Sequence, residues 1–317
     1  MTGAVRPLTI GVTGTAIADS IETTDGVRTE DMGGIYYAVH ALSALLPAGM
    51  VTVPILAVGA DMMERVRADF GALYGVEARG LIEVPQLNNR VRLIYTDTSH
   101  RGERLTGGVR PLTFGELAPW TDQLDVWLWN FISGMETDLA TFGRVAAVFK
   151  GRIYLDLHSL CLDPPGAGPR RSCAPDRWEE WVAPATWLQL NAVEAGLLWR
   201  GEAVRLEPAE EAALCARIHG LGPRGVLVTH GADGAAWYPS WDPAGETAVC
   251  QGAAVVGRAV DPTGCGDVFG AAWLAFHEGL GYPPEVALEA AVRAAGLAAG
   301  VRGTATLSVT LAREERP

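Results

Sequence analysis

The amino-acid sequence predicts an α/β protein in which a mainly parallel sheet carries helices on both faces. Short apolar runs typical of buried strands recur along the 317 residues, and helix-length segments separate most of them. Parallel strands need crossover connections of this kind, so the alternation favours a parallel sheet. The apolar fraction of 49% and the charged fraction of 20% are ordinary for a globular chain that can bury a full core.

The N-terminal part of the chain follows the pattern strand, helix, strand, helix. We expect these four elements at residues 8–12, 35–46, 51–58 and 62–74. An acidic stretch that ends at Asp31 lies between the first two elements and is expected to be exposed. Gly33 and Gly34 come directly before the first helix.

The segment 88–113 interrupts this pattern. A β-prone run at 91–96 leads into a polar turn at 97–102 with no helix between them, which predicts a small β insertion such as a lid. The alternation then resumes, with strands expected at 126–129, 153–157, 187–190 and 226–229 and helices at 138–149, 176–182 and 208–219. Ligands of open α/β sheets bind beyond the carboxyl ends of the strands, so the functional residues should lie where these strands end.

The charge balance argues against a nucleic-acid partner or a membrane surface. The chain has 25 Lys and Arg and 37 Asp and Glu, so the formal charge is 25 − 37 = −12, without a cationic cluster. No stretch reaches the ~18 apolar residues of a membrane span, and the N-terminal apolar run is too short for a signal peptide. The five cysteines form no CxxC pair, which disfavours a zinc site and suits a reducing compartment. We therefore expect a cytoplasmic protein.

The most informative segment is Asp261-Pro262-Thr263-Gly264-Cys265-Gly266-Asp267, which runs into an apolar helix at 268–280. A loop of small residues at a helix start aims unpaired N–H groups and the positive end of the helix dipole at an anion. A carboxylate in that first turn, here Asp267, suits a base that accepts a proton from an attacking hydroxyl. The pattern therefore indicates phosphoryl transfer. The structural alternative is that Asp261 or Asp267 only caps the helix around a tight glycine turn.

This segment resembles the Asp-Thr-x-Gly-Ala-Gly-Asp signature of the PfkB carbohydrate kinases, with Pro262 and Cys265 as departures. Further motifs of that family occur in the same order along most of the chain. They are Gly14 with Asp19, the pair Gly33-Gly34, Asn191 with Glu194, and Thr229 with Gly231 and Gly234. Each alone could be a helix cap, a solvated carboxylate or an ordinary hairpin turn. Five matches in family order and spacing are not expected by accident.

The resemblance implies a fold and a reaction. The fold is one ribokinase-like α/β/α sandwich over residues 1–317, with a β lid formed by segments 13–34 and 88–113. The reaction is in-line transfer of the ATP γ-phosphate to a hydroxyl of a sugar, cyclitol or nucleoside, with Asp267 as base and the amides of Gly264, Cys265 and Gly266 as anion hole.

The resemblance also assigns the remaining site residues. Asn191 and Glu194 would serve the ATP phosphates and, through water, Mg²⁺, and Thr229, Gly231 and Gly234 would lie beside the nucleotide. Asp19, Gly33, Gly34 and Tyr37 would face the acceptor. A monovalent cation such as K⁺ would have a site near Asp261 and Gly303.

The single lysine limits the alternatives. Lys150 is followed by Gly151 and no Gly-x-x-x-x-Gly-Lys-Ser/Thr occurs, so the Walker-type kinases are excluded, and the strand lysine of protein kinases is missing too.

The acceptor motifs depart from those of many sugar kinases, with Tyr37 after the double glycine and His158 in place of the Asn of an Asp-x-Asn-x-Arg motif. These departures put ribose and fructose phosphates in doubt.

Two rival functions are considered. A dinucleotide-binding oxidoreductase would place its glycine fingerprint in the first βαβ unit, whereas Gly264 and Gly266 lie near the C-terminus. A non-catalytic relative that binds a nucleotide or sugar and acts through protein contacts stays open, because fold does not determine function. Exposed lid strands could also pair between subunits, so a homodimer is plausible.

Overall fold

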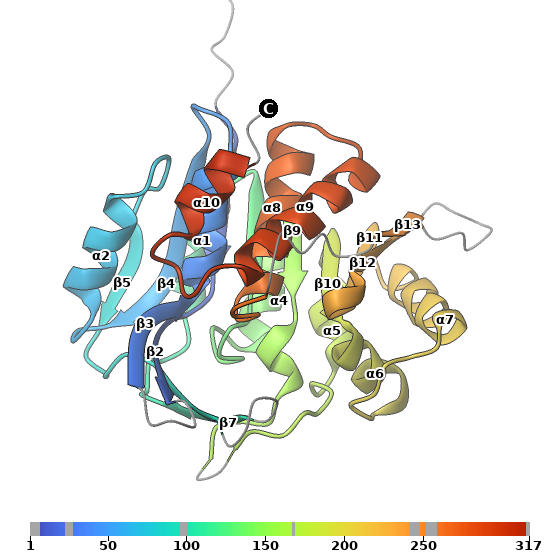
Figure 1. The fold of residues 1–317 in the computed structure, drawn as a ribbon, viewed down its shortest axis with the longest axis horizontal. Helices are drawn as coiled ribbons and strands as arrows, with labels where there is room; N and C mark the ends of the chain where they lie inside the picture. The colour runs from blue at the N-terminus through green and yellow to red at the C-terminus, as the bar shows by residue number, and fades with distance from the viewer. Residues whose placement is uncertain are drawn as a thin grey trace, which may run out of the picture.

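The computed structural model describes residues 7–22, 28–95, 101–166, 169–240, 248–251 and 259–314 (Figure 1). Its core is a nine-stranded sheet in the order β13-β12-β11-β10-β9-β8-β1-β4-β5. The strands of this sheet are β1 (Thr9–Thr13), β4 (Val51–Gly59), β5 (Gly80–Val84), β8 (Val126–Asn130), β9 (Arg152–Asp156), β10 (Trp187–Asn191), β11 (Gly225–Thr229), β12 (Ala235–Pro239) and β13 (Ala248–Gln251).

Seven neighbouring strands of the central sheet, from β11 to β5, run parallel, and β12 and β13 continue the sheet as antiparallel strands. From β1 the chain proceeds to β4 and β5 on one side, and later from β8 to β11 on the other. The strand order therefore reverses between β1 and β8, and ligands of such sheets bind near this reversal at the carboxyl ends of the strands.

Alternating side chains along the strands form two apolar cores, one on each face of the sheet. On β8, for example, Val126 and Leu128 enter one core while Trp127 and Trp129 enter the other. The first core is covered by α1 (Ile35–Leu45), α2 (Met63–Gly71), α8 (Cys265–Leu274), α9 (Pro284–Ala299) and α10 (Leu307–Glu314). The second is covered by α3 (Phe114–Leu117), α4 (Leu139–Val148), α5 (Trp178–Val182), α6 (Ala192–Arg200) and α7 (Pro208–His219). The predicted three-layer α/β/α sandwich with a mainly parallel sheet is confirmed.

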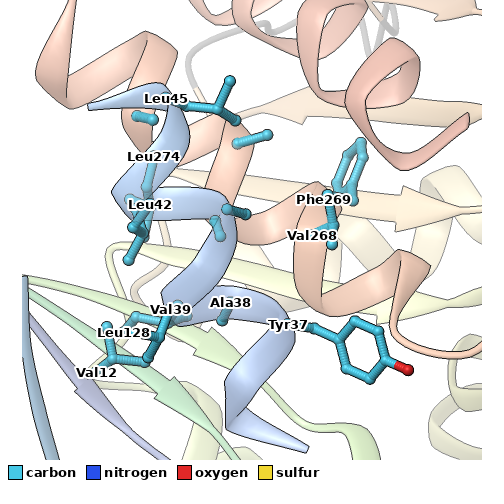
Figure 2. Packing of buried hydrophobic residues seen from close by; sticks show 14 of the residues in the cluster. Val12, Tyr37, Ala38, Val39, Leu42, Leu45, Leu128, Val268, Phe269 and Leu274 are labelled. Carbon is cyan, nitrogen blue, oxygen red and sulfur yellow. The ribbon is translucent and has the colours of Figure 1, made fainter. Parts of the chain in front are cut away.

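The first core brings the two ends of the sequence together. Helix α1 packs against α8 and α10, so an N-terminal helix lies beside the C-terminal ones (Figure 1). Figure 2 shows Leu42 and Leu45 of α1 near Leu274 of α8, while the ring of Tyr37 extends from the start of α1 with its hydroxyl pointing away from the cluster. This packing fixes the start of α8 relative to α1.

A second, four-stranded sheet has the order β3-β2-β6-β7. Its strands are β2 (Ala16–Glu22), β3 (Arg28–Gly34), β6 (Arg90–Tyr95) and β7 (Arg101–Thr106). The β insertion expected at 88–113 is confirmed as the β6–β7 hairpin, and its tip at 96–100 lies outside the described residues. The acidic stretch that ends at Asp31 was expected as an exposed segment. It pairs as β2 and β3 of this sheet, within the segment 13–34 for which the resemblance implied β structure.

The strands and helices predicted for the central sheet are found within a few residues of their expected bounds. The sequence patterns did not reveal β5, β12, β13, α6, α9 and α10. In the described part of the chain, no helix combines the length and apolar character needed to cross a membrane.

Candidate active site

A cavity of about 540 Å³ opens where the carboxyl ends of β9 to β11 meet the start of α8. Most of the residues predicted from sequence line it, although they come from distant parts of the chain. These are Asp19, Gly34, Tyr37, Asn191, Glu194, Thr229, Gly231, Gly234, Gly264, Cys265, Gly266 and Asp267. Gly33 and Asp261 do not line the cavity directly and are described below.

The strand register places polar side chains next to one another at this edge. Asn130 at the end of β8 pairs with Asp156 at the end of β9, and Asn191 at the end of β10 pairs with Thr229 at the end of β11. Parallel strands that end together thus deliver four polar residues along one edge of the sheet.

Helix α8 begins at this edge with an unusual backbone. Gly264 caps the helix with φ of 78°, and a Cβ there would lie 2.2 Å from Cγ of Tyr37, so only glycine fits under the tyrosine ring. In the described part of the chain, neither Gly264 nor Gly266 donates its amide hydrogen to another residue, whereas the Cys265 amide donates to the Pro262 carbonyl at 3.3 Å. The start of α8 therefore presents unpaired donors and the positive end of the helix dipole.

Asp267 lies in the first turn of α8 and is 7% exposed. Its Oδ1 accepts a hydrogen bond from Nδ2 of Asn130 at 2.6 Å. Burial raises the pKa of Asp267, and the charge of His158 and the Asn130 hydrogen bond oppose that rise. A carboxylate with a raised pKa is a stronger proton acceptor, which suits a general base.

Gln189 connects this helix turn to the sheet. Its Nε2 donates to Oδ2 of Asp156 at 3.0 Å and to the carbonyl of Gly266 at 3.1 Å, while its Oε1 accepts from the hydroxyl of Tyr154 at 2.6 Å. Gln189 is 3% exposed, so these hydrogen bonds are shielded from solvent. They hold the glycine turn at a fixed position over β9 and β10.

Asn191 and Glu194 form a capping box at the start of α6. Oδ1 of Asn191 accepts from the amides of Val193 and Glu194 at 2.9 Å, and Glu194 accepts in return from the Asn191 amide at 2.9 Å. The capping alternative considered from the sequence is therefore real, and both side chains nevertheless border the cavity. Burial raises the pKa of Glu194 to about 7.

The hairpin after β11 carries Thr229, Gly231 and Gly234. Its anchor is His230, whose Nε2 lies 2.9 Å from Oε2 of Glu211 on α7. Oε1 of the same carboxylate accepts from the hydroxyl of Tyr238 at 2.7 Å. The glycines are thus positioned by a buried contact between α7, β12 and the hairpin.

The second sheet contributes Asp19 on the opposite side of the cavity. Gly33 on the neighbouring strand leaves room for it, since a Cβ at Gly33 would lie 1.9 Å from Oδ2 of Asp19. Burial raises the pKa of Tyr37, and the nearby Asp261, Asp19 and Asp267 add to the rise. The Tyr37 hydroxyl therefore stays protonated and can donate a hydrogen bond.

The two residues named for a monovalent cation make different contacts. Oδ1 of Asp261 accepts from the Thr263 amide at 2.9 Å, and the Asp261 amide donates to the Ala299 carbonyl. Gly303 instead packs on Asp31, whose Oδ2 would lie 1.7 Å from an added Cβ. Among the described residues, no group of three or more His, Cys, Asp or Glu side chains is arranged to hold a metal ion.

Sequence reasoning did not single out Asn130 and Gln189. Both belong to buried strands and carry no motif around them, so the only available signal was their position at or near the carboxyl end of a predicted strand.

Residues 159–311, just under half of the chain, match the sequence profile of the pfkB family carbohydrate kinases. This region contains every motif from Asn191 to Asp267, whereas Asp19 and the double glycine lie outside it. No curated protein matches the chain at a significant level.

Solved structures resemble the chain over nearly its whole length. Arabidopsis thaliana ribokinase in complex with ribose and ATP has 19% sequence identity and a TM-score of 0.75 and covers 98% of both chains. A pyrophosphate-dependent kinase of the ribokinase family, bound to a pyrophosphate analogue and myo-inositol, has 17% identity and a TM-score of 0.73 over 93% of this chain and 96% of that chain. Burkholderia thailandensis nucleoside kinase in complex with inosine has 16% identity and a TM-score of 0.70 over 95% and 93%.

At these identities the likeness establishes the fold. The molecule is thus an α/β protein of ribokinase-like fold with an acidic cavity beside a helix start. Within this fold, residues 159–311 are similar to the pfkB family carbohydrate kinases.

Proposed function

We propose that the protein is an ATP-dependent kinase that phosphorylates a hydroxyl of a sugar, cyclitol or nucleoside. The observation that carries the proposal is the buried carboxylate of Asp267, held by Asn130 beside the unpaired amides of Gly264 and Gly266. A proton acceptor next to an anion-binding helix start is the arrangement that transfer of a phosphoryl group to an alcohol requires.

In the proposed reaction the acceptor hydroxyl lies against Asp267, which takes its proton as the new O–P bond forms. The bond between the γ-phosphorus and the bridging oxygen breaks, and ADP leaves with the electron pair. The amides at the start of α8 stabilise the negative charge on the transferred group, as their dipole and free N–H groups favour an anion. The Cys265 amide contributes less in this arrangement, because it is already donated to Pro262.

The charges of the cavity fit a nucleotide that brings Mg²⁺ with it. Asp156, Glu194 and Asp267 are acidic, and no Lys or Arg lines the cavity in the described part of the chain. Mg²⁺ would neutralise phosphate charge, and Asn191 and Glu194 would hold it through water. A K⁺ site near Asp261 and Gly303 remains part of the proposal, and Gly303 packs there against Asp31.

The donor is proposed to be ATP because one part of the cavity is apolar. Small and apolar residues from α9 and the segment before α8 line it, namely Ala259, Val292, Ala295, Gly296 and Ala299. An adenine ring needs such walls, whereas pyrophosphate does not. Thr229, Gly231 and Gly234 would lie beside the same nucleotide.

The acceptor is proposed to bind between the start of α8 and the second sheet, which would serve as the lid. Asp19 and Tyr37 supply a hydrogen-bond acceptor and a donor for hydroxyl groups, and Gly33 and Gly34 allow close approach.

A homodimer through the lid and a cytoplasmic location remain predictions; light scattering of the purified protein tests the first and cell fractionation the second.

The proposal is tested by a panel of donors and acceptors. ATP and pyrophosphate, each with Mg²⁺, are combined with neutral sugars, inositols and nucleosides, and the phosphorylated product is detected directly. Turnover of one acceptor with ATP supports the proposal, and turnover with pyrophosphate alone contradicts the donor assignment. Tight nucleotide binding without turnover of any acceptor would favour the non-catalytic relative.

A further inference from the structure

Among the residues that the structure describes, one side chain that lines the cavity can carry positive charge at neutral pH. Four carboxylates line it, from Asp19, Asp156, Glu194 and Asp267, and among the described lining residues His158 is the one basic group. A polyphosphate that enters this cavity would therefore meet a single protein cation.

The backbone holds His158 at a defined position between β9 and α6. It follows Asp156 and Leu157 and adopts φ of 38°, a left-handed conformation that is uncommon for a residue with a side chain. The next residue fixes this turn, since the Ser159 amide donates to the Phe131 carbonyl at 3.0 Å. An uncommon backbone conformation of this kind is kept only where the surrounding contacts hold it in place, and such conformations are frequent at functional sites.

One ring nitrogen of His158 is already engaged. Nδ1 lies 2.9 Å from Oγ of Ser159, which orients the imidazole and leaves Nε2 for a ligand. His158 lines the same cavity as Asp267, Asn191 and Glu194.

Charged groups reach His158 from every element around it. Asp156 lies on β9, Glu194 on α6, Asp267 on α8 and Glu136 in the loop after β8. Burial by itself lowers the pKa of His158, but these carboxylates outweigh it and the pKa is raised above its usual value. The imidazolium form therefore persists to higher pH than in a free histidine.

We propose that His158 is a phosphate-binding residue whose imidazolium contacts the phosphoryl group of the donor, between Asp267 and Glu194. The inference rests on the proposed kinase function. It assigns to a histidine the cationic contact that lysine or arginine supplies in other phosphate sites. In the rival account, His158 is only a structural counter-ion for the surrounding carboxylates and never touches the donor.

The test is the binding of a non-hydrolysable ATP analogue with Mg²⁺, measured by calorimetry at about pH 6 and about pH 8.5, on either side of the usual histidine range. The variants are His158→Gln and His158→Lys. The matched control is His219→Gln on α7, where Nδ1 of the histidine lies 3.0 Å from the Pro223 carbonyl, away from the cavity.

The affinity of the wild type relative to His158→Gln should be greater at the lower pH, a comparison that removes the titration of Glu194, which both proteins share. His158→Gln should lose roughly tenfold or more in affinity there and little at the higher pH, as expected for losing a charged hydrogen bond. His158→Lys should bind well at both, because its charge persists. Because the two variants change the side chain differently, loss of folding in one still leaves the other as a test.

An equal loss for His158→Gln at both pH values, or no loss at the lower pH, would overturn the inference. Wild-type binding with the expected pH dependence but no phosphorylation of any acceptor would overturn the kinase proposal and leave the role of His158 in place. Absence of nucleotide binding at both pH values would overturn both.

Discussion

Asn130 donates a hydrogen bond of 2.6 Å to Oδ1 of Asp267 and so joins the carboxyl end of β8 to the first turn of α8. Both side chains are buried and 137 residues apart in the sequence. The bond occupies one carboxylate oxygen and leaves the other for an acceptor hydroxyl. Asn130 is thus a positioning residue for the proposed base.

Replacing Asn130 by Ala should shift the acid limb of the activity profile to higher pH. Burial raises the pKa of Asp267, and the Asn130 bond is one of the interactions that oppose this rise. Without it the carboxylate protonates more readily, so activity falls at a higher pH as the solution is acidified. The measurement is kcat/KM as a function of pH.

Thr137→Ala is the matched control for this variant, because it also removes a buried hydrogen bond, from Thr137 Oγ1 to the Leu112 carbonyl at 2.9 Å. It should leave the position of the acid limb unchanged. An unshifted limb in Asn130→Ala would mean that the bond does not tune the base.

Gly264→Ala should damage both stability and activity. The added methyl would lie 2.2 Å from Cγ of Tyr37, and the residue has φ of 78°. The backbone conformation alone costs about 1–2 kcal/mol for a non-glycine residue, and displacing the ring adds about 1–3 kcal/mol. Chemical denaturation gives the free energy of unfolding.

Gly201→Ala separates these two costs, since Gly201 has φ of 73° and nothing within 4 Å of an added Cβ. Gly264→Ala should be the more destabilising of the two, and the difference should shrink in a Tyr37→Ala background. Equal costs at the two glycines would show that Tyr37 does not restrict Gly264.

Glu211→Gln should destabilise the protein at neutral pH by about 1–3 kcal/mol, the usual range for hydrogen bonds to a charged group. Burial alone would raise the pKa of Glu211, but the bonds from His230 and Tyr238 outweigh it, so the pKa is lowered. A carboxyl group whose pKa is lowered by folding stabilises the protein at pH values above its unfolded-state pKa. This stabilisation is lost as the pH falls through the folded-state pKa.

The free energy of unfolding of the wild type should therefore fall more steeply on acidification than that of Glu211→Gln. The exposed Glu83 on β5 supplies the control substitution, Glu83→Gln. Parallel pH dependence in wild type and Glu211→Gln would contradict the assigned role of this carboxylate.

The sequence predicted the parts of the molecule that depend on local pattern. Apolar runs separated by helical segments located most strands of the parallel sheet, and the glycine loop before Asp267 located the start of α8. Strand β5 was not predicted because its apolar run is short, and β12 and β13 were not predicted because no helix separates them from each other. The contacts of Asn130 and Gln189 could not be predicted, since strand register and the packing of α8 create them, and neither is visible in local sequence.

Asp267 is proposed as the base of a phosphoryl transfer, and the substitution Asp267→Asn examines this role. Asparagine keeps the shape of the side chain but cannot accept the proton, so turnover of the acceptor should fall by about 10²–10⁴-fold while nucleotide affinity is kept. Asp122→Asn, at an exposed position, is the control. Turnover that is indifferent to Asp267→Asn would rule out Asp267 as the base; turnover that collapses in this variant alone, with nucleotide binding intact, is expected if Asp267 takes the proton.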